Sequence, residues 1–295
     1  MTRATAEDPW TTLDDPGRPW TTQTHKGRRR GSPRGRIGLA ARSRSRLAAV
    51  PERAVIDKLV LAIDQTEVAD ILRLGRNVLG RVGCVKISSH LVQRMAPGRA
   101  FEFVRNHRAR SIFYDARFVD DRPANLAADI RVVCGDGKVP MRPPELLSVH
   151  HAVGRKGLLA AVDAAHGRTE VVVFLGSSNW GPDDYQAMHD ARAEDVVRKW
   201  ARIAADAGVQ SVMCAAADAW VIKEDPQCEH LRVYGTGIRD EGEQSGEHTR
   251  TITPEVALRH GVDYLVVGSP IAHAQQPAAV LDRYANAVRG HRRRR

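Results

Sequence analysis

Short apolar runs alternate with amphipathic stretches of helical length from about residue 55 to the end of the chain. Because the runs are brief and rich in β-branched residues, they are typical of buried strands, and the stretches between them are typical of helices. We predict strands at 58–63, 83–87, 111–114, 146–149, 170–175, 210–214, 231–234 and 264–267. We predict helices at 67–79, 91–106, 125–131, 156–165, 183–207, 216–223, 254–260 and 278–288.

Strands that alternate with helices along this whole region favour parallel βα units. Eight such units over residues 55–290 match the size and rhythm of an α/β protein of the (β/α)8 TIM barrel class. A doubly wound open sheet is the alternative, but no Gly-x-Gly-x-x-Gly motif follows the first strand. In a TIM barrel the chemistry lies at the carboxyl ends of the strands, so the residues there are the candidates for function.

Charged residues follow the predicted strand 111–114, beginning with Asp115, Arg117 and Asp120. Alternate residues of a strand point the same way, so Asp115 and Arg117 would share one face if the strand continued. Opposed charges in a partly dry pocket shift each other's pKa values, which acid–base and electrostatic catalysis require. A solvated charge run in a surface loop is the alternative.

Two further charges lie at the ends of the first two predicted strands. Asp64 follows the first strand, and Lys86 lies near the end of the second, within an apolar run. A lysine in such a run is costly to bury without a partner, so it either reaches solvent from an edge or pairs with carboxylates. Beside Asp115 and Arg117, we interpret Lys86 as part of one alternating array of charges.

The segment Asp115-Ala-Arg117-Phe-Val-Asp120 resembles the Asp-x-Lys-x-x-Asp signature of the orotidine 5'-monophosphate decarboxylase superfamily, with arginine in place of the lysine. Three later motifs resemble the last two strands of bacterial members: Gly-Thr-Gly-Ile-Arg at 235–239, Thr-Arg-Thr-Ile-Thr-Pro at 249–254 and Val-Val-Gly-Ser-Pro-Ile at 266–271. The fourth strand ends in His150 and His151, resembling the Asn-Val-His-Ala of those members. Adjacent strand residues face opposite sides, so this pair is a poor metal chelate, and we expect one of the two to line the pocket.

The resemblance implies a set of substrate-binding residues. Asp64 and Lys86 match the positions that hold the ribose hydroxyls, and Ser178 matches, by register, the serine that hydrogen-bonds the pyrimidine edge. Ser177 is the alternative at that position, and both serines also suit an ordinary turn. Around the phosphate the resemblance implies Gly235, Gly237, Arg239, Gly268 and Ser269, where serine at 269 replaces the phosphate-binding arginine of the family.

In the mechanism that the resemblance implies, the substrate loses CO₂ and leaves a carbanion at C6 of the pyrimidine. The catalytic residues would be Lys86, Asp115, Arg117 and Asp120. The lysine of the family stabilises and protonates that carbanion, whereas arginine stabilises negative charge but is a very weak acid. We expect a carbon–carbon lyase of pyrimidine metabolism that acts on orotidine 5'-phosphate or a related nucleotide or nucleoside, without a cofactor or a metal.

Two other interpretations remain open. A catalytically impaired pseudoenzyme would bind a nucleotide or a protein partner without turnover. A sugar-phosphate enzyme of the hexulose-phosphate type would belong to the same superfamily, but the Gly-Ile-Arg and Thr-Pro-x-x-Ala motifs argue against it. The resemblance further implies a homodimer in which Asp120 acts in the partner's pocket. Asp121 and Ala124 stand where the family has an aliphatic residue and a threonine, which indicates a changed substrate.

The net charge of +10 is concentrated at the ends of the chain. Residues 26–46 hold nine basic residues and no acidic one, and residues 289–295 hold five arginines, so the remainder is mildly acidic. We interpret 1–54 as a disordered basic extension and 291–295 as a basic tail, and we favour solvated tails over nucleic-acid contact. The Pro- and Gly-rich stretch within 131–145 is predicted to be an inserted loop.

The four cysteines contain no Cys-x-x-Cys pair, which argues against a zinc site or a disulfide scaffold. No apolar run is long enough to span a membrane or to form a secretory signal. We therefore expect a cytoplasmic protein that does not associate with membranes.

Overall fold

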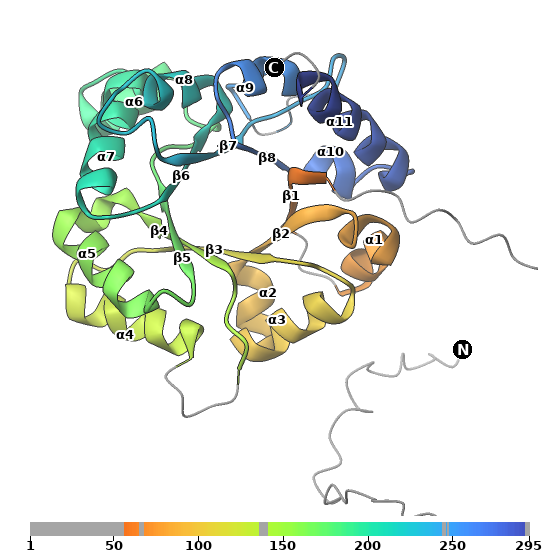
Figure 1. Cartoon of the computed structure of the whole chain (residues 1–295), viewed down its shortest axis with the longest axis horizontal. Helices are drawn as coiled ribbons and strands as arrows, with labels where there is room; N and C mark the ends of the chain where they lie inside the picture. Colours follow the sequence, from red (N-terminus) through yellow and green to blue (C-terminus); the bar gives the residue numbers. More distant parts are fainter. Residues whose placement is uncertain (1–55, 65–67, 136–140, 244–245, 247, 293–295) are drawn as a thin grey trace, which may run out of the picture. The chain divides into compact units, whose positions relative to one another are not determined.

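Eight parallel strands close into a barrel in chain order, with β8 paired to β1 (Figure 1). The computed structural model describes residues 56–64, 68–135, 141–243, 246 and 248–292. The strands are β1 (Ile56–Ile63), β2 (Val82–Ser88), β3 (Ile112–Phe118), β4 (Leu146–His150), β5 (Glu170–Phe174), β6 (Ser211–Ala215), β7 (Arg232–Thr236) and β8 (Tyr264–Val267). The predicted (β/α)8 barrel is confirmed.

Helices surround the barrel on its outer side (Figure 1). They are α1 (Val68–Leu79), α2 (Ser89–Met95), α3 (Pro97–Asn106), α4 (Pro123–Cys134), α5 (Gly154–Ala165), α6 (Pro182–His189), α7 (Ala193–Asp206), α8 (Ala219–Lys223), α9 (Pro254–Arg259), α10 (Ser269–Ala272) and α11 (Pro277–Arg292). Two short 3₁₀ turns, η1 (His151–Val153) and η2 (Ala216–Asp218), follow β4 and β6.

Two predicted helices are each broken in two. The predicted helix 91–106 is α2 and α3, and 183–207 is α6 and α7. The first break follows from Pro97, because a residue before proline avoids the helical region, and Ala96 has a φ of 63°. The second break is at Asp190, whose φ of 50° is left-handed and ends α6. The short helix α10 was not predicted.

Strand β3 is longer than predicted. The apolar pattern ends at residue 114, but backbone pairing continues, with Asp115 opposite Ser88 and Phe118 opposite Val149. The pattern marks only the buried part of the strand, because residues at the barrel mouth can be polar and still pair. Asp115 and Arg117 therefore belong to β3 itself.

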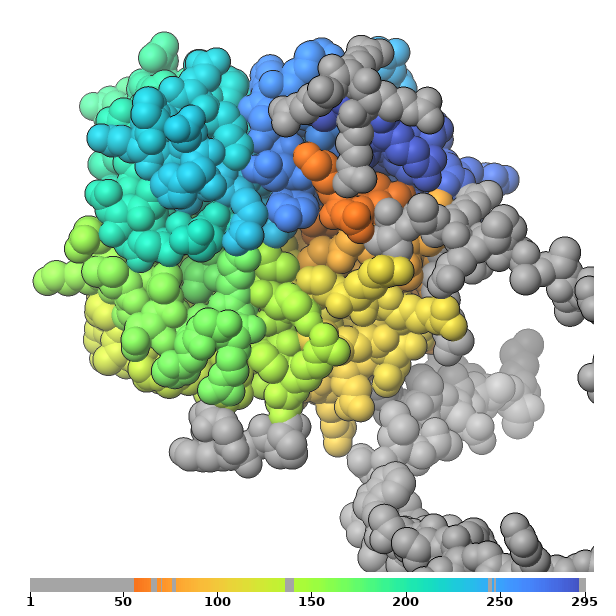
Figure 2. Space-filling model, viewed as in Figure 1, coloured from red at the N-terminus to blue at the C-terminus, as the bar shows by residue number. Residues whose placement is uncertain are grey.

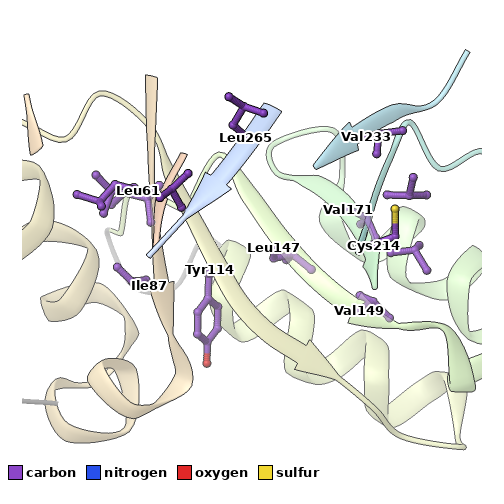
Figure 3. Packing of buried hydrophobic residues seen from close by; sticks show 14 of the residues in the cluster. Leu61, Ile87, Tyr114, Leu147, Val149, Val171, Cys214, Val233 and Leu265 are labelled. Atoms are coloured by element: carbon purple, nitrogen blue, oxygen red, sulfur yellow. The ribbon is translucent and has the colours of Figure 1, made fainter. Parts of the chain in front are cut away.

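The side chains of the strands alternate between two apolar clusters. Outward residues such as Leu61, Leu147 and Val149 pack with the helices in the larger cluster (Figure 3). Inward residues fill the barrel, so that side chains occupy the centre of the ring in the space-filling view (Figure 2). They are Val60, Ala62, Cys84, Phe113, Leu146, Val172, Phe174, Met213, Tyr234 and Val266. The inward positions beyond them, toward the carboxyl ends of the strands, carry the polar residues of the candidate site.

Three sequence predictions concern the parts of the chain between and outside the elements. The extension predicted at 1–54 lies outside the described residues. Helix α4 continues to Cys134, so the inserted loop is shorter than predicted, and residues 136–140 within it are likewise not described. Helix α11 continues to Arg292, into the predicted basic tail. In the described part of the chain, no helix is long and apolar enough to cross a membrane.

Candidate active site

A buried ion pair between β2 and β3 forms the centre of the site. The ammonium of Lys86 lies 2.8 Å from Oδ2 of Asp115 and 3.3 Å from Oδ1 of Asp64. The side chains of Lys86 and Asp115 are 6% and 4% exposed, whereas Asp64 reaches solvent at the end of β1. The barrel thus brings together three charges from three strand ends, as the sequence predicted.

Arg117 completes this group from the end of β3. Its Nε and Nη2 atoms each lie 3.4 Å from an oxygen of Asp115, so the two residues do share one face. The φ of Arg117 is 48°, and β3 departs from regular pairing with β4 here. The Arg117 amide donates to Oγ of Ser148 at 2.7 Å, and the same hydroxyl donates to Asp115 at 2.8 Å. Asp64, Lys86, Asp115 and Arg117 are called the charge array below.

The guanidinium of Arg117 is also held by an aromatic ring. Its central carbon lies 4.3 Å from the ring centroid of Phe174, at the end of β5. A cation over an aromatic face is attracted by the ring quadrupole. Although the Arg117 side chain is 47% exposed, it is therefore fixed between Asp115 and Phe174.

Burial opposes charge on Lys86 and Asp115, yet both remain charged at neutral pH. Burial alone would lower the pKa of Lys86, but the carboxylates of Asp115 and Asp64 outweigh it and raise that pKa. Burial would raise the pKa of Asp115, but Lys86, Arg117 and the hydrogen bond from Ser148 hold it well below its usual range. The site therefore presents a fixed carboxylate between two cations.

A second group of polar residues lies across the mouth, at the ends of β5 and β7. The buried Oγ of Ser178 lies 2.6 Å from Nδ1 of His248 and accepts a hydrogen bond from Thr236 at 3.2 Å. Ser177 instead accepts from the backbone N–H of Asn179, as a turn residue does. Of the two serines, Ser178 is the one that faces the other polar groups. Ser178, Thr236 and His248 are called the neutral cluster below.

The glycines predicted to surround a phosphate are tightly packed. Gly237 has a φ of 73°, and a Cβ there would lie 2.5 Å from the carbonyl oxygen of Arg250. A Cβ on Gly235 would lie 2.8 Å from the Val262 side chain, whereas one on Gly268 would meet Ala62 at 3.3 Å. The close approach of backbone at Gly237 therefore requires glycine.

Arg239 and Ser269 meet at the end of the barrel where the phosphate is predicted. Nη2 of Arg239, a buried residue, donates to Oγ of the exposed Ser269 at 3.2 Å. Burial lowers the pKa of Arg239, but the group remains a cation at neutral pH because arginine begins from such a high value. A guanidinium is therefore present beside Ser269 even though residue 269 has none.

Asp120 lies outside the charge array. Its carboxylate accepts the backbone N–H of Arg122 at 2.8 Å and lies 4.0 Å from that residue's guanidinium. Asp121 and Ala124, which follow it, are exposed. Within a single chain, Asp120 therefore pairs locally and does not belong to the charge array.

Phe174, Thr236 and His248 were not identified from the sequence. Thr236 could have been predicted from strand alternation. It follows the inward Tyr234 by two residues, so both side chains point into the barrel. His248 lies in the segment after β7, where no periodicity predicts its direction. Within the described residues, no group of three or more His, Cys, Asp or Glu residues could hold a metal ion.

A family-wide sequence model described as "Orotidine 5'-phosphate decarboxylase / HUMPS family" matches residues 57–284. The chain belongs to this family. The match includes every residue of the charge array and of the neutral cluster. The family resemblance stated from the motifs is thereby confirmed.

Individual relatives support the assignment to the orotidine 5'-phosphate decarboxylase family. The chain is 31% identical over 222 residues to the orotidine 5'-phosphate decarboxylase of Thermobifida fusca (strain YX), covering 75% of this chain and 91% of the relative. It is 29% identical to the enzyme of that name from Rhodospirillum rubrum, covering 78% and 93%. The solved orotidine 5'-monophosphate decarboxylase of Methanocaldococcus jannaschii superposes with a TM-score of 0.62, covering 78% of this chain and 98% of that one. At 19% identity, this last likeness supports the fold alone.

Proposed function

We propose that this protein is a carboxy-lyase that removes CO₂ from orotidine 5'-phosphate. The observation that carries the proposal is the charge array, with an ionised Asp115 held between Lys86 and Arg117 at the carboxyl end of the barrel. A buried ion pair contributes little to stability, so its presence at the mouth is better explained by chemistry than by folding. This favours an enzyme over a pseudoenzyme.

The charge array suits the breaking of a carbon–carboxylate bond. When a pyrimidine carboxylate lies against Asp115, two like charges repel, and loss of CO₂ relieves the repulsion. The electron pair that stays on carbon then lies beside the guanidinium of Arg117. A cation placed before the reaction stabilises charge that develops in the transition state without reorganisation.

The remaining predicted residues would bind the rest of the nucleotide. Asp64 and Lys86 would hold the ribose hydroxyls, and Ser178, supported by Thr236, would bind the pyrimidine edge. The phosphate would lie against the backbone of Gly235, Gly237 and Gly268 and the side chains of Arg239 and Ser269. A backbone free of side chains allows N–H groups to approach an anion, and Arg239 adds a charge.

We further propose a homodimer in which Asp120 acts in the partner's site. Val119, beside Asp120, is 66% exposed, so the end of β3 is accessible to a second subunit. Mixing Asp64→Asn with Asp120→Asn subunits tests this. In a mixed dimer one of the two sites carries both native residues, so random mixing should restore about a quarter of the wild-type activity. Verified mixed dimers without activity would exclude the action of Asp120 in the partner's site.

The test of the proposed function is a decarboxylation assay with orotidine 5'-phosphate and orotidine in parallel. We expect turnover of the phosphate, with slower turnover of orotidine, because binding energy from a remote phosphate is used in the chemical step. Turnover of orotidine alone would indicate a nucleoside enzyme. A nucleotide substrate and four free, buried cysteines fit the cytoplasmic setting that we propose.

A further inference from the structure

The segment between β7 and α9 runs back beside the end of β7. The backbone N–H of Ile252 donates to the carbonyl of Gly237 at 3.1 Å, and that of Arg239 donates to the carbonyl of Ile252 at 3.1 Å. Because backbone groups on both sides of this contact are paired, the position of the segment is well defined. The segment includes the 249–254 motif, to which the proposed substrate contacts assign no role.

The same segment holds Ser178 by its backbone and by its side chain. The backbone N–H groups of Thr249 and Arg250 donate to the Ser178 carbonyl at 3.1 and 3.0 Å, and the Thr249 hydroxyl donates to the same oxygen at 3.3 Å. His248 meets the Ser178 hydroxyl through Nδ1 at 2.6 Å. The orientation of Ser178 therefore depends on where residues 248–250 lie.

The side chain of Arg250 anchors this segment in the barrel wall. Its Nη2 atom donates to Oδ1 of Asp218 in η2, and the two side chains are 18% and 2% exposed. The guanidinium carbon also lies 5.6 Å from the ring centroid of Tyr185, a fully buried residue of α6. Tyr185 in turn packs on the chain just before Ser178, because a Cβ added to Gly176 would overlap its hydroxyl. Arg250 thus connects its segment to the elements that surround β5 and β6.

The burial of Asp218 explains why this anchor is strong. Burial raises the pKa of its carboxyl group, whereas the hydrogen bond and the charge of Arg250 lower it. A buried carboxylate that loses its cation is strongly destabilised, so Asp218 favours the arrangement in which Arg250 reaches it. A displaced Arg250 would carry Thr249 and His248 with it, because the three residues are consecutive.

A second ion pair of the same form lies at the opposite end of the barrel. Arg202 of α7 bonds Asp225 at 2.7 Å, and the Asp225 carboxylate is 4% exposed. Asp225 lies between α8 and β7, so it is near the amino ends of the strands and away from the candidate site. This pair resembles that of Arg250 and Asp218 in the burial of its acid. A substitution of Arg202 is therefore a matched control for one of Arg250.

We infer that Arg250 is a positioning residue, which places Ser178 against the pyrimidine edge of the substrate through its bond to Asp218. The inference rests on the part of the proposed function in which Ser178 binds that edge. The guanidinium of Arg250 contacts Asp218 and Tyr185, so it acts on the ligand through its own backbone segment. Loss of the side chain should therefore weaken binding of the ligand and leave the bond-breaking step, on the other side of the mouth, almost unchanged.

The test compares Arg250→Met with the control Arg202→Met, each in the wild-type and in the Ser178→Ala background. The measured quantities are KM and kcat for orotidine 5'-phosphate, Kd for uridine 5'-phosphate and the melting temperature. Both Met variants should melt several degrees lower, because each leaves a buried carboxylate without its cation. Only Arg250→Met should raise KM and Kd, by about tenfold, with kcat within about twofold of the wild type. Without the Ser178 hydroxyl, the same change should raise them less than about threefold.

Arg250→Lys tests the charge of the anchor. The ammonium keeps a cation beside Asp218, so this change should raise KM and Kd by less than about threefold. If Arg250→Met has no cooperative thermal transition, Arg250→Gln replaces it, because glutamine keeps a hydrogen-bond donor but no charge.

Several results would overturn the inference. An unchanged KM and Kd in Arg250→Met would make its ion pair purely structural, and an equal rise in Arg202→Met would assign the effect to lost stability. An equal rise in both backgrounds would mean that Arg250 does not act through Ser178. A wild type that binds uridine 5'-phosphate without decarboxylating orotidine 5'-phosphate would overturn the proposed decarboxylation alone, because Kd still reports the coupling. A wild type that does neither would overturn both.

Discussion

The two sides of the barrel mouth use different chemistry. On the side of β1 to β3, each of the four ionised groups of the charge array lies within 3.4 Å of another member. The almost fully buried Asp115 is at their centre. On the side of β5 and β7, two hydroxyls and an imidazole form the neutral cluster, joined by hydrogen bonds of 2.6 and 3.2 Å. The first side has the electrostatics that a bond-breaking step needs, and the second has the donors and acceptors that recognise a polar ligand.

This difference has an energetic basis. Moving a charge out of water costs several kcal/mol unless the charge is paired. Removing one buried member of the charge array therefore leaves its partner as a buried, unpaired charge. A neutral hydrogen bond contributes only about 1 kcal/mol net. Substitutions on the two sides should therefore differ in both size and kind, as the following predictions specify.

The largest effect on stability is expected for Lys86→Met. This change leaves Asp115 buried with only the partly exposed Arg117 as a cation, which should lower the free energy of unfolding by about 3 to 5 kcal/mol. Urea unfolding at pH 7 measures it. The control is Lys156→Met, at an exposed position on α5, which should change stability by less than about 0.5 kcal/mol.

The same variant predicts a pH dependence. The folded pKa of Asp115 is lowered, so its stabilisation is full above the unfolded value of about 4 and is lost as the pH falls below it. The folded pKa of Lys86 is raised, so its contribution is full below about 10 and is lost at higher pH. The stability gap between wild type and Lys86→Met should therefore be constant from about pH 5 to pH 9 and narrow at pH 3. A stability difference between the two proteins that is the same at pH 3 and pH 7 would contradict an ionised pair of Lys86 and Asp115.

Asp115→Asn should lower kcat by about 10²- to 10³-fold, the range for loss of one electrostatic group in an active site. The amide keeps the size of the side chain but removes the charge that would repel the substrate carboxylate. Asp129→Asn serves as the control, because Asp129 is exposed on α4. Equal kcat values for the two variants would exclude a role for the Asp115 charge.

Gly237→Ala should lower the free energy of unfolding more than Gly242→Ala. Both glycines have a positive φ, so both variants carry the left-handed cost of about 1 kcal/mol. Only the Cβ at 237 also meets backbone, at 2.5 Å from Arg250, whereas the one at 242 has nothing within 4 Å. The difference, measured by urea unfolding, should be about 1 to 3 kcal/mol. Equal losses of stability in the two variants would contradict the close approach of the Arg250 backbone to Gly237.

The smallest effect is expected in the neutral cluster. Ser178→Ala removes the hydroxyl that bonds Thr236 and His248, and should raise KM about tenfold with little change in kcat. Ser177→Ala should leave both constants unchanged, because that hydroxyl bonds only the nearby backbone of Asn179. If kcat falls instead of KM rising, Ser178 belongs with the catalytic side.

The members of the charge array could be predicted from the sequence, whereas His248 of the neutral cluster could not. Asp64, Lys86 and Asp115 lie at strand ends, where the short apolar runs predict both the strand and its direction. His248 comes from an irregular segment, and its contact with Ser178 spans 70 residues, so only tertiary structure brings them together. The contact of Arg117 with Phe174 depends on a φ of 48°, which no residue pattern predicts for arginine.

Sequence patterns failed elsewhere for local reasons. Backbone pairing carries β3 four residues beyond its apolar run, and Pro97 divides a helix that apolar spacing alone would continue. Asp120 is a different case. Its motif suggests a catalytic role, but within one chain its partners are the nearby Arg122 and Asn125, so its assignment depends on an assembly that a sequence does not specify.

The most direct test of the central claim is release of labelled CO₂ from orotidine 5'-phosphate carrying ¹³C in its carboxylate. Purified wild-type protein and the Asp115→Asn variant are compared by following the label and uridine 5'-phosphate together. The charge array predicts equal amounts of the two products from the wild type and a rate lower by about 10²-fold or more in the variant. Release at the same rate from both proteins, or no release from the wild type, would contradict the assignment of decarboxylation to this site.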